Sequence, residues 1–364
     1  MIYIPILKTR DEEFRIVKNV KDCFGDTIIP LFEIISERYE TKYKKDEITG
    51  KFLYESKGKR RCKIKQDPTQ DDIITLEYIN DLIENKTAFI EYFRFSRKKY
   101  KGNIDIRRVE LAYDLNNDID LYKMKVKAIS KYPNLIPVVT IKDEFDINIT
   151  ELVDLLNELH LKCKKISLRI TENWLEKYRK VICDYLNEED FLLFDIEEQN
   201  PESKFMEIDE LLELDIKAKI VLINSPRKIE IRNGEYPEHG VTNLINNCAR
   251  IVASENNLYG FGDYCGLKDA IPLKDGSNGT GAALALLYDY KKNKFHSYAN
   301  HDTSLGVRGY SSLVLIIKSE RNLLDKDGDC PGIKKMTEIP GTGSWSTWHN
   351  INASRYIYQV YKNL

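Results

Sequence analysis

Polar residues end most of the short apolar runs in this chain. Residues of these types could form a catalytic or metal-binding site together. Carboxylates held beside a lysine and an arginine can bind a divalent cation, or act as general acid and base when their surroundings separate the pKa values. The run-ending residues are Lys8, Glu33, Glu91, Thr140, Arg169, Asp195, Asn224 and Asp263. The candidate catalytic residues among them are Lys8, Glu33, Glu91, Arg169 and Asp195.

A structural interpretation of the same residues stays open. Inward polar side chains also pair in ion networks inside folds that have no catalytic activity. In addition, a strand boundary displaced by one residue turns each side chain to the opposite face of the sheet. The pattern therefore predicts a shared polar site and leaves catalysis by it as a hypothesis.

Segments rich in lysine and arginine follow the second and third runs. Residues 38–65 contain eleven Lys or Arg against four Asp or Glu, and residues 94–108 contain seven against one. Such cations neutralise phosphates, and the interleaved aromatic rings can stack on bases, which favours a nucleotide or nucleic-acid ligand. A solvated face, or a docking surface for an acidic protein, fits the same composition. The candidate phosphate-binding residues are Lys59, Arg60, Arg61, Arg94 and Arg97, with Asn224 and Asp263 from the strand ends.

A histidine and a glycine-rich segment add further candidates. His301 precedes Asp302 after a predicted hairpin at 283–298, which we expect to fold over the strand ends, so His301 could act as a general base or metal ligand. The glycine-rich residues 275–281 lack the Lys-Ser/Thr ending of a P-loop. Either a flexible connection or a phosphate-binding nest remains possible there.

Short strands alternate with amphipathic helices along the chain, and these elements must position the polar residues. Between the runs, apolar residues recur at i, i+3, i+4 and i+7, which is typical of helices covering a parallel sheet buried on both faces. Eight such units favour the α/β class and a (β/α)8 TIM-like barrel over a doubly wound sheet, and barrel strands end at one shared mouth. The strands are predicted near 3–7, 27–34, 87–93, 135–141, 165–170, 191–195, 219–223 and 258–263.

Insertions interrupt the barrel pattern. Residues 36–68 are predicted to form a long loop or a hairpin inserted after the second strand, at the rim of the mouth, and residues 266–309 carry the hairpin after the eighth. We expect residues 310–324 to supply the last barrel helix, so the barrel domain is 1–325. Residues 326–364 are a predicted C-terminal loop and helix packed on the barrel. The glycines of 258–263 suit either a crowded barrel position or a ligand that approaches the backbone.

Composition indicates the compartment. The formal charge of −2 gives no overall signal for nucleic acid or membranes. Seven scattered cysteines without a CxxC pair indicate a reducing compartment. No apolar run approaches the roughly 18 residues of a membrane span, and the N-terminus lacks a signal-peptide pattern. We predict a cytoplasmic protein without membrane contact.

Four short motifs are spread over the chain, at 3–14, 28–34, 327–332 and 344–349. Together they resemble the "beta protein" family of phages, satellite phages and bacteria. The resemblance implies an accessory component of a mobile anti-phage locus of the Gop–Beta–cII kind, whose beta component is associated with restraining a toxic neighbour. It implies a neighbouring defence-module protein as partner and assigns no catalytic residue.

The leading prediction is therefore an accessory, regulatory component of an anti-phage module. It would bind a partner effector, with a phosphate-containing ligand at the barrel mouth. One alternative is a metal-dependent hydrolase or nuclease-like enzyme acting on a nucleotide or nucleic acid with a divalent cation as cofactor. Another is a plain nucleic-acid-binding protein. The fold does not choose among them, because barrels host many unrelated functions.

Overall fold

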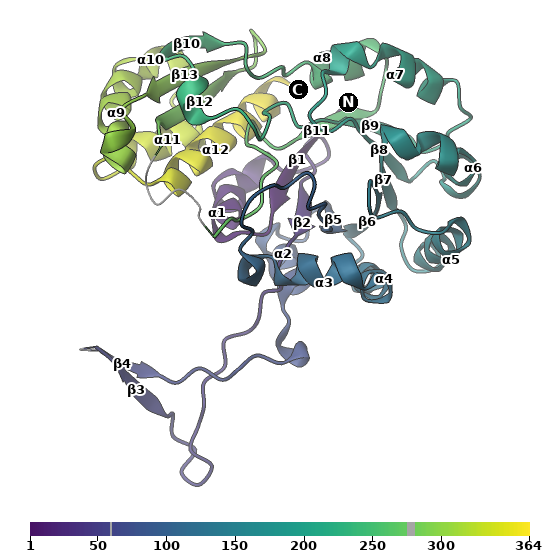
Figure 1. Cartoon of the computed structure of the whole chain (residues 1–364), viewed down its shortest axis with the longest axis horizontal. Helices are drawn as coiled ribbons and strands as arrows, with labels where there is room; N and C mark the ends of the chain where they lie inside the picture. The colour runs from purple at the N-terminus through teal and green to yellow at the C-terminus, as the bar shows by residue number, and fades with distance from the viewer. Residues whose placement is uncertain (59, 275–280) are drawn as a thin grey trace.

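A closed parallel barrel organises the chain. In the computed structural model, which describes residues 1–58, 60–274 and 281–364, eight strands of the described residues follow one another around the barrel in the order β1-β11-β9-β8-β7-β6-β5-β2 (Figure 1). The predicted (β/α)8 TIM-like fold is confirmed. The strands are β1 (Ile2–Lys8), β2 (Leu31–Ile34), β5 (Ala88–Tyr92), β6 (Leu135–Ile141), β7 (Ser167–Thr171), β8 (Phe191–Asp195), β9 (Lys219–Ile223) and β11 (Gly260–Asp263).

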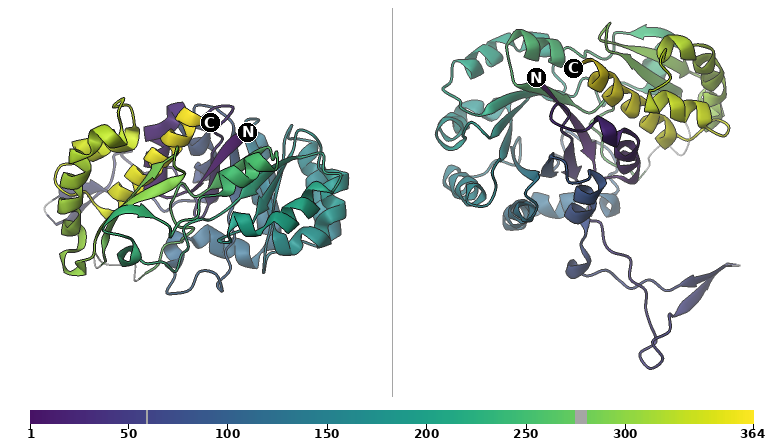
Figure 2. Two further views of the ribbon diagram at one scale, coloured as in Figure 1. Left: turned by 90° about the horizontal axis from the view of Figure 1, so that it is seen from above. Right: turned by 180° about the vertical axis from the view of Figure 1, so that it is seen from behind.

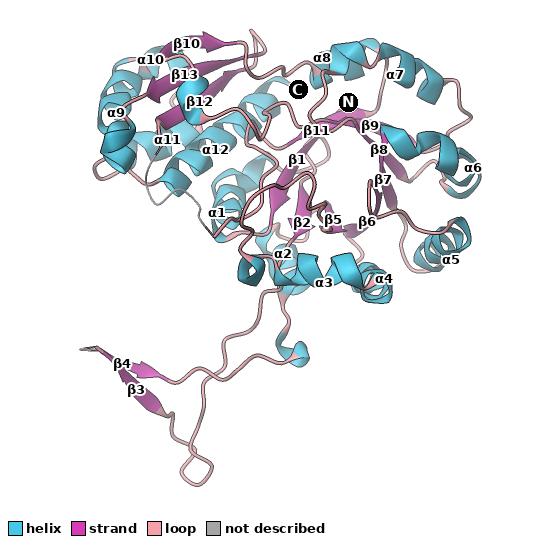
Figure 3. Ribbon diagram, in the orientation of Figure 1, coloured by secondary structure: helices cyan, strands magenta, loops and turns pink. Residues whose placement is uncertain are grey.

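Helices surround the barrel on its outside, as Figures 2 and 3 show. Among them, α5 is amphipathic and buries its leucines at helical spacing against the strands. Within the described residues, no helix has both the length and the apolarity to cross a membrane. The helices that follow barrel strands are α1 (Asp11–Val20), α2 (Thr75–Leu82), α3 (Glu110–Asn117), α4 (Ile119–Ala128), α5 (Ile149–His160), α6 (Leu175–Tyr185), α7 (Phe205–Leu212) and α8 (Ala249–Glu255).

The C-terminal helix α12 (Trp345–Asn363) lies beside α1 on the barrel wall. Asn19 of α1 donates from Nδ2 to Oδ1 of Asn350 at 2.6 Å, and the ring of Tyr356 lies 5.9 Å from that of Tyr3. We expected residues 310–324 in this place. They form α9 (Tyr310–Ser319) and α10 (Arg321–Leu324) instead, away from the barrel. The reason is that α12 is buried on most of its sides, whereas α9 buries one stripe.

A second, antiparallel sheet, here called the outer sheet, covers the other side of α12. Its strands β10 (His239–Thr242), β13 (Lys294–Asn300) and β12 (Ala283–Asp289) pair in that order. Phe295 stacks on Tyr356 of α12 at 5.7 Å between ring centroids, and α11 (Pro331–Glu338) also packs along α12. The β12–β13 hairpin therefore lies against α12 and does not fold over the strand ends, contrary to our expectation.

Residues 39–73 leave the barrel as a hairpin-like arm, which we call the arm. Within it, β3 (Tyr54–Lys57) pairs with β4 (Arg60–Lys63), and isolated bridges continue the pairing back to Tyr39 and Ile73. Figures 1 and 2 both show the arm projecting away from the barrel beyond α2. The insertion after the second strand is thus a hairpin, which was one of the two predicted forms, but it does not rim the mouth.

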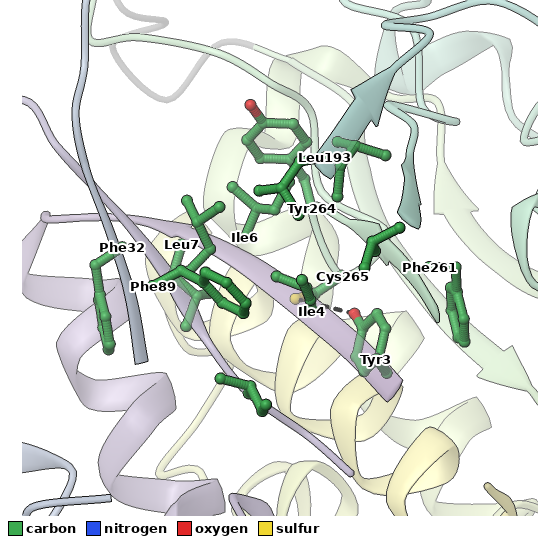
Figure 4. Close-up of a cluster of buried hydrophobic side chains, with 14 of the residues drawn as sticks. Tyr3, Ile4, Ile6, Leu7, Phe32, Phe89, Leu193, Phe261, Tyr264 and Cys265 are labelled. Carbon is green, nitrogen blue, oxygen red and sulfur yellow. Dashed lines mark hydrogen bonds between the residues drawn. The ribbon is translucent and has the colours of Figure 1, made fainter. Parts of the chain in front are cut away.

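Side chains alternate between the barrel interior and the helix-covered wall. Ile4 lies inside, opposite Gly262 of β11, whereas Tyr3 turns outward to α12 (Figure 4). The interior is narrow there: a Cβ on Gly262 would lie 2.6 Å from Cδ1 of Ile223, and one on Gly260 would lie 2.5 Å from the Ile2 carbonyl oxygen. The glycines of β11 are thus required by a crowded barrel position.

Candidate functional site

The barrel strands end at a cavity of 540 Å³, here called the mouth cavity. Residues at the ends of β6, β7 and β8 line it, together with loops that follow β5, β8, β9 and β11. The cavity lies at the carboxyl ends of the strands, where barrel enzymes and binding proteins hold their ligands.

Arg169 of β7 lines the mouth cavity and stands at the centre of an ion network. Its Nη1 donates to Oε1 of Glu33 at 2.8 Å and to Oε2 of Glu91 at 2.7 Å, and its Nη2 donates to Oδ2 of Asp195 at 2.7 Å. Lys8 pairs with the other oxygen of Glu33. All of these side chains are buried. The structure therefore brings together Lys8, Glu33, Glu91, Arg169 and Asp195, which are five of the eight run-ending residues.

Asp269, in the loop after β11, extends this network. Its Oδ1 accepts from Lys8 at 2.6 Å and its Oδ2 accepts from Lys99 at 2.9 Å. Burial would raise the pKa of Asp269, but the two ammonium groups hold that pKa well below its usual range. The pKa of Glu33 is likewise lowered, since Lys8 and Arg169 outweigh the effect of burial. Both carboxyls are therefore ionised and neutralised by cations at neutral pH.

The network leaves little capacity for a metal ion. Glu33, Glu91 and Asp195 have one buried carboxylate oxygen that lacks a hydrogen-bond partner among the described residues. It is Oε1 of Glu91. Magnesium and calcium need several free oxygen ligands, and one oxygen beside a guanidinium does not supply them. The geometry is that of a neutralised ion network at the base of a cavity.

Lys142 differs from the other cations of the mouth cavity. It follows β6, and within the described residues it forms no ion pair, whereas Lys98, Lys99 and Arg169 each contact a carboxylate. Its Nζ lies 4.4 Å from the ring centroid of Phe93. Burial lowers the pKa of Lys142 to about 8. This ammonium group can accept an anion, or lose its proton and act as a nucleophile.

Other unused polar atoms accompany Lys142. Oγ1 of Thr140 and Oγ1 of Thr171 are buried and have no hydrogen-bond partner in the part of the chain that the structure describes. Glu198, half-buried at the rim, accepts from the Ile229 backbone N–H at 2.8 Å, and burial raises its pKa. The cavity therefore offers a carboxyl group and a cation to a polar ligand, and its wall contains two hydroxyls without a partner among the described residues.

The arginines after β5 do not enter the mouth cavity as ligands. Nη2 of Arg94 donates to the carbonyl oxygens of Thr140 and Phe145 at 2.9 and 3.1 Å, so Arg94 holds backbone in place. Arg97 is exposed, and its guanidinium lies 5.3 Å from the ring centroid of Tyr113.

Asn224 and Asp263 are also directed elsewhere. Asn224 donates from Nδ2 to two backbone carbonyl groups of the loop after β8, both at 2.8 Å. Asp263 accepts from the hydroxyls of Tyr3 and Tyr356 on the α12 side of the wall. The next residue, Tyr264, takes the inward position and donates from Oη to Glu33 at 2.6 Å. Asp263 was thus assigned to the wrong face by a single residue.

The remaining predicted residues lie apart from the mouth cavity. Nε2 of His301 is 2.8 Å from the carbonyl oxygen of Tyr236, and its Nδ1 is 3.6 Å from Glu238. Arg60 and Arg61 lie on β4 in the arm. Lys59 and most of the glycine-rich segment, residues 275–280, lie outside the described residues.

Sequence reasoning missed three residues of the site: Lys142, Tyr264 and Asp269. Lys99 and Tyr100 lie in the basic segment 94–108 but were not singled out within it. Lys142 continues the inward alternation of Thr140 by one step of two, and Tyr264 does the same for Gly262. Continuing the alternation of inward positions two residues beyond the end of each strand would have identified both residues. Asp269 comes from a loop, for which no periodic signal exists.

Comparison with protein families finds a match that covers most of the chain. The model of a family described as Beta protein matches residues 3–289. This range contains the barrel strands, the arm and the mouth cavity. No curated protein matches the sequence.

Proposed function

The chain belongs to the Beta protein family, and from this premise we propose that it is an accessory, regulatory component of an anti-phage defence module. In this proposal it binds a partner effector protein through the arm. The observation that carries the proposal is the arm itself, which projects from the barrel and presents cations and aromatic rings to solvent.

The surface chemistry of the arm suits an acidic protein partner. The guanidinium carbon of Arg61 lies 4.3 Å from the ring centroid of Tyr54, and Nζ of Lys63 lies 3.8 Å from the ring centroid of Phe52. Both rings are exposed, at 43% for Tyr54 and 38% for Phe52. Aromatic and arginine side chains are enriched where proteins bind one another, and the basic excess of this segment favours an acidic surface.

The arm joins the rest of the chain at its base. Lys42 pairs with Asp72 there, and the Arg38 guanidinium lies 4.1 Å from the ring centroid of Tyr78. Further out, among the described residues, β3 and β4 pair with each other and with no strand of the barrel. A ribbon of this kind has marginal stability alone, so a bound partner would supply the packing that the rest of the chain does not.

The experiment is co-purification of the tagged full chain with the products of its neighbouring genes. In one variant a short Gly-Ser linker replaces residues 43–65; the base stays closed because the Gln66 N–H donates to the Lys42 carbonyl at 2.9 Å. A second variant carries Arg60→Glu and Arg61→Glu. We expect both to lose the partner, while a matched reversal at Lys291 and Lys292, on the β12–β13 turn, retains it.

Two results would contradict this proposal. One is a wild-type chain that stays alone when its neighbours are co-expressed, and the other is a variant without the arm that still retains the partner. Capture of nucleic acid by the arm, with affinity that falls steeply with salt, would favour the nucleic-acid-binding alternative instead.

Lys142 favours a second function, the binding of a small phosphate-containing ligand in the mouth cavity. Its ammonium forms no ion pair among the described residues, and Thr140 and Thr171 line the same cavity. Calorimetric titration with inorganic phosphate and with ATP tests this function. We expect Lys142→Met to abolish binding and Lys98→Met, at an 87% exposed side chain, to retain it. Equal binding by wild type and Lys142→Met would disprove it.

The hydrolase alternative receives less support from the geometry. It requires Glu33, Glu91 and Asp195 to hold a metal or transfer protons, yet each is paired with Arg169. Glu91→Gln and Asp195→Asn variants that lose activity while keeping their fold and partner would revive it.

A further inference from the structure

His239, His296 and Glu320 meet between the outer sheet and the junction of α9 with α10. In the β10–β13 pairing, His239 is opposite Tyr298 and Val241 is opposite His296. The two imidazoles are therefore diagonal neighbours on one face of the sheet, with ring centroids 5.1 Å apart. Glu320 separates α9 from α10 and reaches the same face.

The donor atoms of this cluster converge. One ligand atom from each residue lies within 4.8 Å of the other two, and Nε2 of His239 is 2.9 Å from Oε1 of Glu320. Nε2 of His296 is buried and has no hydrogen-bond partner among the described residues. A polar atom shielded from water in this way is costly unless something binds it.

Tyr298 holds the glutamate in position. Its hydroxyl donates to Oε2 of Glu320, which leaves Oε1 directed at the histidines. The His296 ring also stacks on Tyr298, with centroids 4.8 Å apart. Hydrogen bonds of this kind, made to a ligand by a residue behind it, orient the ligands of protein metal sites.

We propose that His239, His296 and Glu320 bind a transition-metal ion of the zinc class. Two imidazole nitrogens and a carboxylate oxygen are ligands that zinc takes, with a tetrahedral position left for water. Calcium and magnesium prefer oxygen ligands throughout. Zinc ligands lie about 3.4 Å apart, since each bond is about 2.1 Å long. The present atoms need small side-chain rotations to reach that spacing, and His239, 49% exposed, is free to make them.

The ion would join three separate parts of the chain. His239 begins β10, which follows the loop from β9; His296 lies in the β12–β13 hairpin; Glu320 follows α9. The loop before β10 also contributes Ile229 and Glu230 to the mouth cavity. Zinc would therefore fix the outer sheet to α9 and α10 at the β10 end of the loop between β9 and β10. The earlier part of the same loop borders the mouth cavity. None of the three ligands lines that cavity or belongs to the arm.

The test uses the full chain, freed of metal by a chelator and then titrated with zinc alone in competition with a chromogenic zinc indicator. We expect one zinc ion bound at this site and a higher melting temperature with zinc. His296→Gln and His239→Gln should weaken binding by about a hundredfold or more, and Tyr298→Phe, which keeps every ligand, by about tenfold to a hundredfold. His301→Gln is the matched control, because His301 also lies near a carboxylate, Glu238.

The proposal is overturned if the wild-type chain does not compete with the indicator for zinc, or if His296→Gln and Tyr298→Phe bind zinc as well as wild type. It is also overturned if His301→Gln loses as much affinity as His296→Gln, since zinc would then bind surface histidines without selection. Melting of each metal-free variant checks its fold. If His296→Gln fails to fold, His239→Gln and Tyr298→Phe decide the result.

Discussion

Nη1 of Arg169 lies 2.7 Å from Oε2 of Glu91, and this contact links β7 to β5 past the strand between them. The same nitrogen contacts Glu33 of β2, and the neighbouring Nη2 contacts Asp195 of β8. One guanidinium therefore compensates carboxylates from three strands in a place shielded from water. The stability of the barrel mouth depends on it, because buried charges need partners.

Arg169→Met should destabilise the protein by about 3–5 kcal/mol, since it leaves buried carboxylates without their cation. Urea denaturation followed by circular dichroism measures the change. Arg179→Met on α6 is the control: that side chain is 56% exposed and 4.0 Å from Glu176, and its removal should cost less than about 1 kcal/mol. Similar losses in both variants would show that the network is not a stabilising feature.

Asp263→Asn should stabilise the protein above pH 6. Burial raises the pKa of Asp263 to about 6, so the folded state binds a proton that the unfolded state has already lost. Wild-type stability should therefore fall as pH rises from about 4 to 6, by up to about 3 kcal/mol at about 1.4 kcal/mol per pKa unit. Asparagine cannot ionise, and Tyr356 can still donate to Asn247, 3.0 Å away. Urea midpoints measured across this pH range check the prediction; parallel profiles for both proteins would refute it.

Gly262→Ala should destabilise the barrel by about 1–3 kcal/mol. The added methyl would lie 2.9 Å from the Ile4 carbonyl oxygen as well as against Ile223, and neither strand can move without breaking the ladder. Gly25→Ala is the matched control, because nothing lies within 4 Å of its Cβ position. Thermal melting compares the two, and equal melting temperatures would mean that the interior has spare room.

The amine of Lys142 should react near pH 8. Burial lowers its pKa to about 8, against about 10.4 for an ordinary lysine, so a larger share is deprotonated at that pH. Pulse labelling with an acylating reagent, read out by peptide mass spectrometry, gives its rate against pH. We expect the half-maximum near pH 8 and protection by phosphate or ATP if either binds. A half-maximum above pH 10 would contradict the assignment.

The strand residues of the site could be predicted because they obey a local rule. Lys8, Glu33, Glu91, Arg169 and Asp195 each lie at an inward position near the end of an apolar run, and closure of the barrel makes those ends meet. The prediction for Asp263 was wrong by one residue. The apolar run did not show that its two glycines take the inward positions of the strand, which places Asp263 on the outward face. The histidine cluster escaped notice because its ligands come from three distant segments.

The amino-acid sequence by itself determined the strands and helices, their parallel arrangement and the polar character of the strand ends. Those features follow from apolar periods of two and of about 3.6 residues, which neighbouring residues fix. Only the tertiary structure decided that Lys8 pairs with Asp269, 261 positions away, that Lys142 forms no ion pair among the described residues, and that the arm leaves the barrel. Charge pairing at such separations depends on where loops and insertions pack, and that packing is settled by the whole fold.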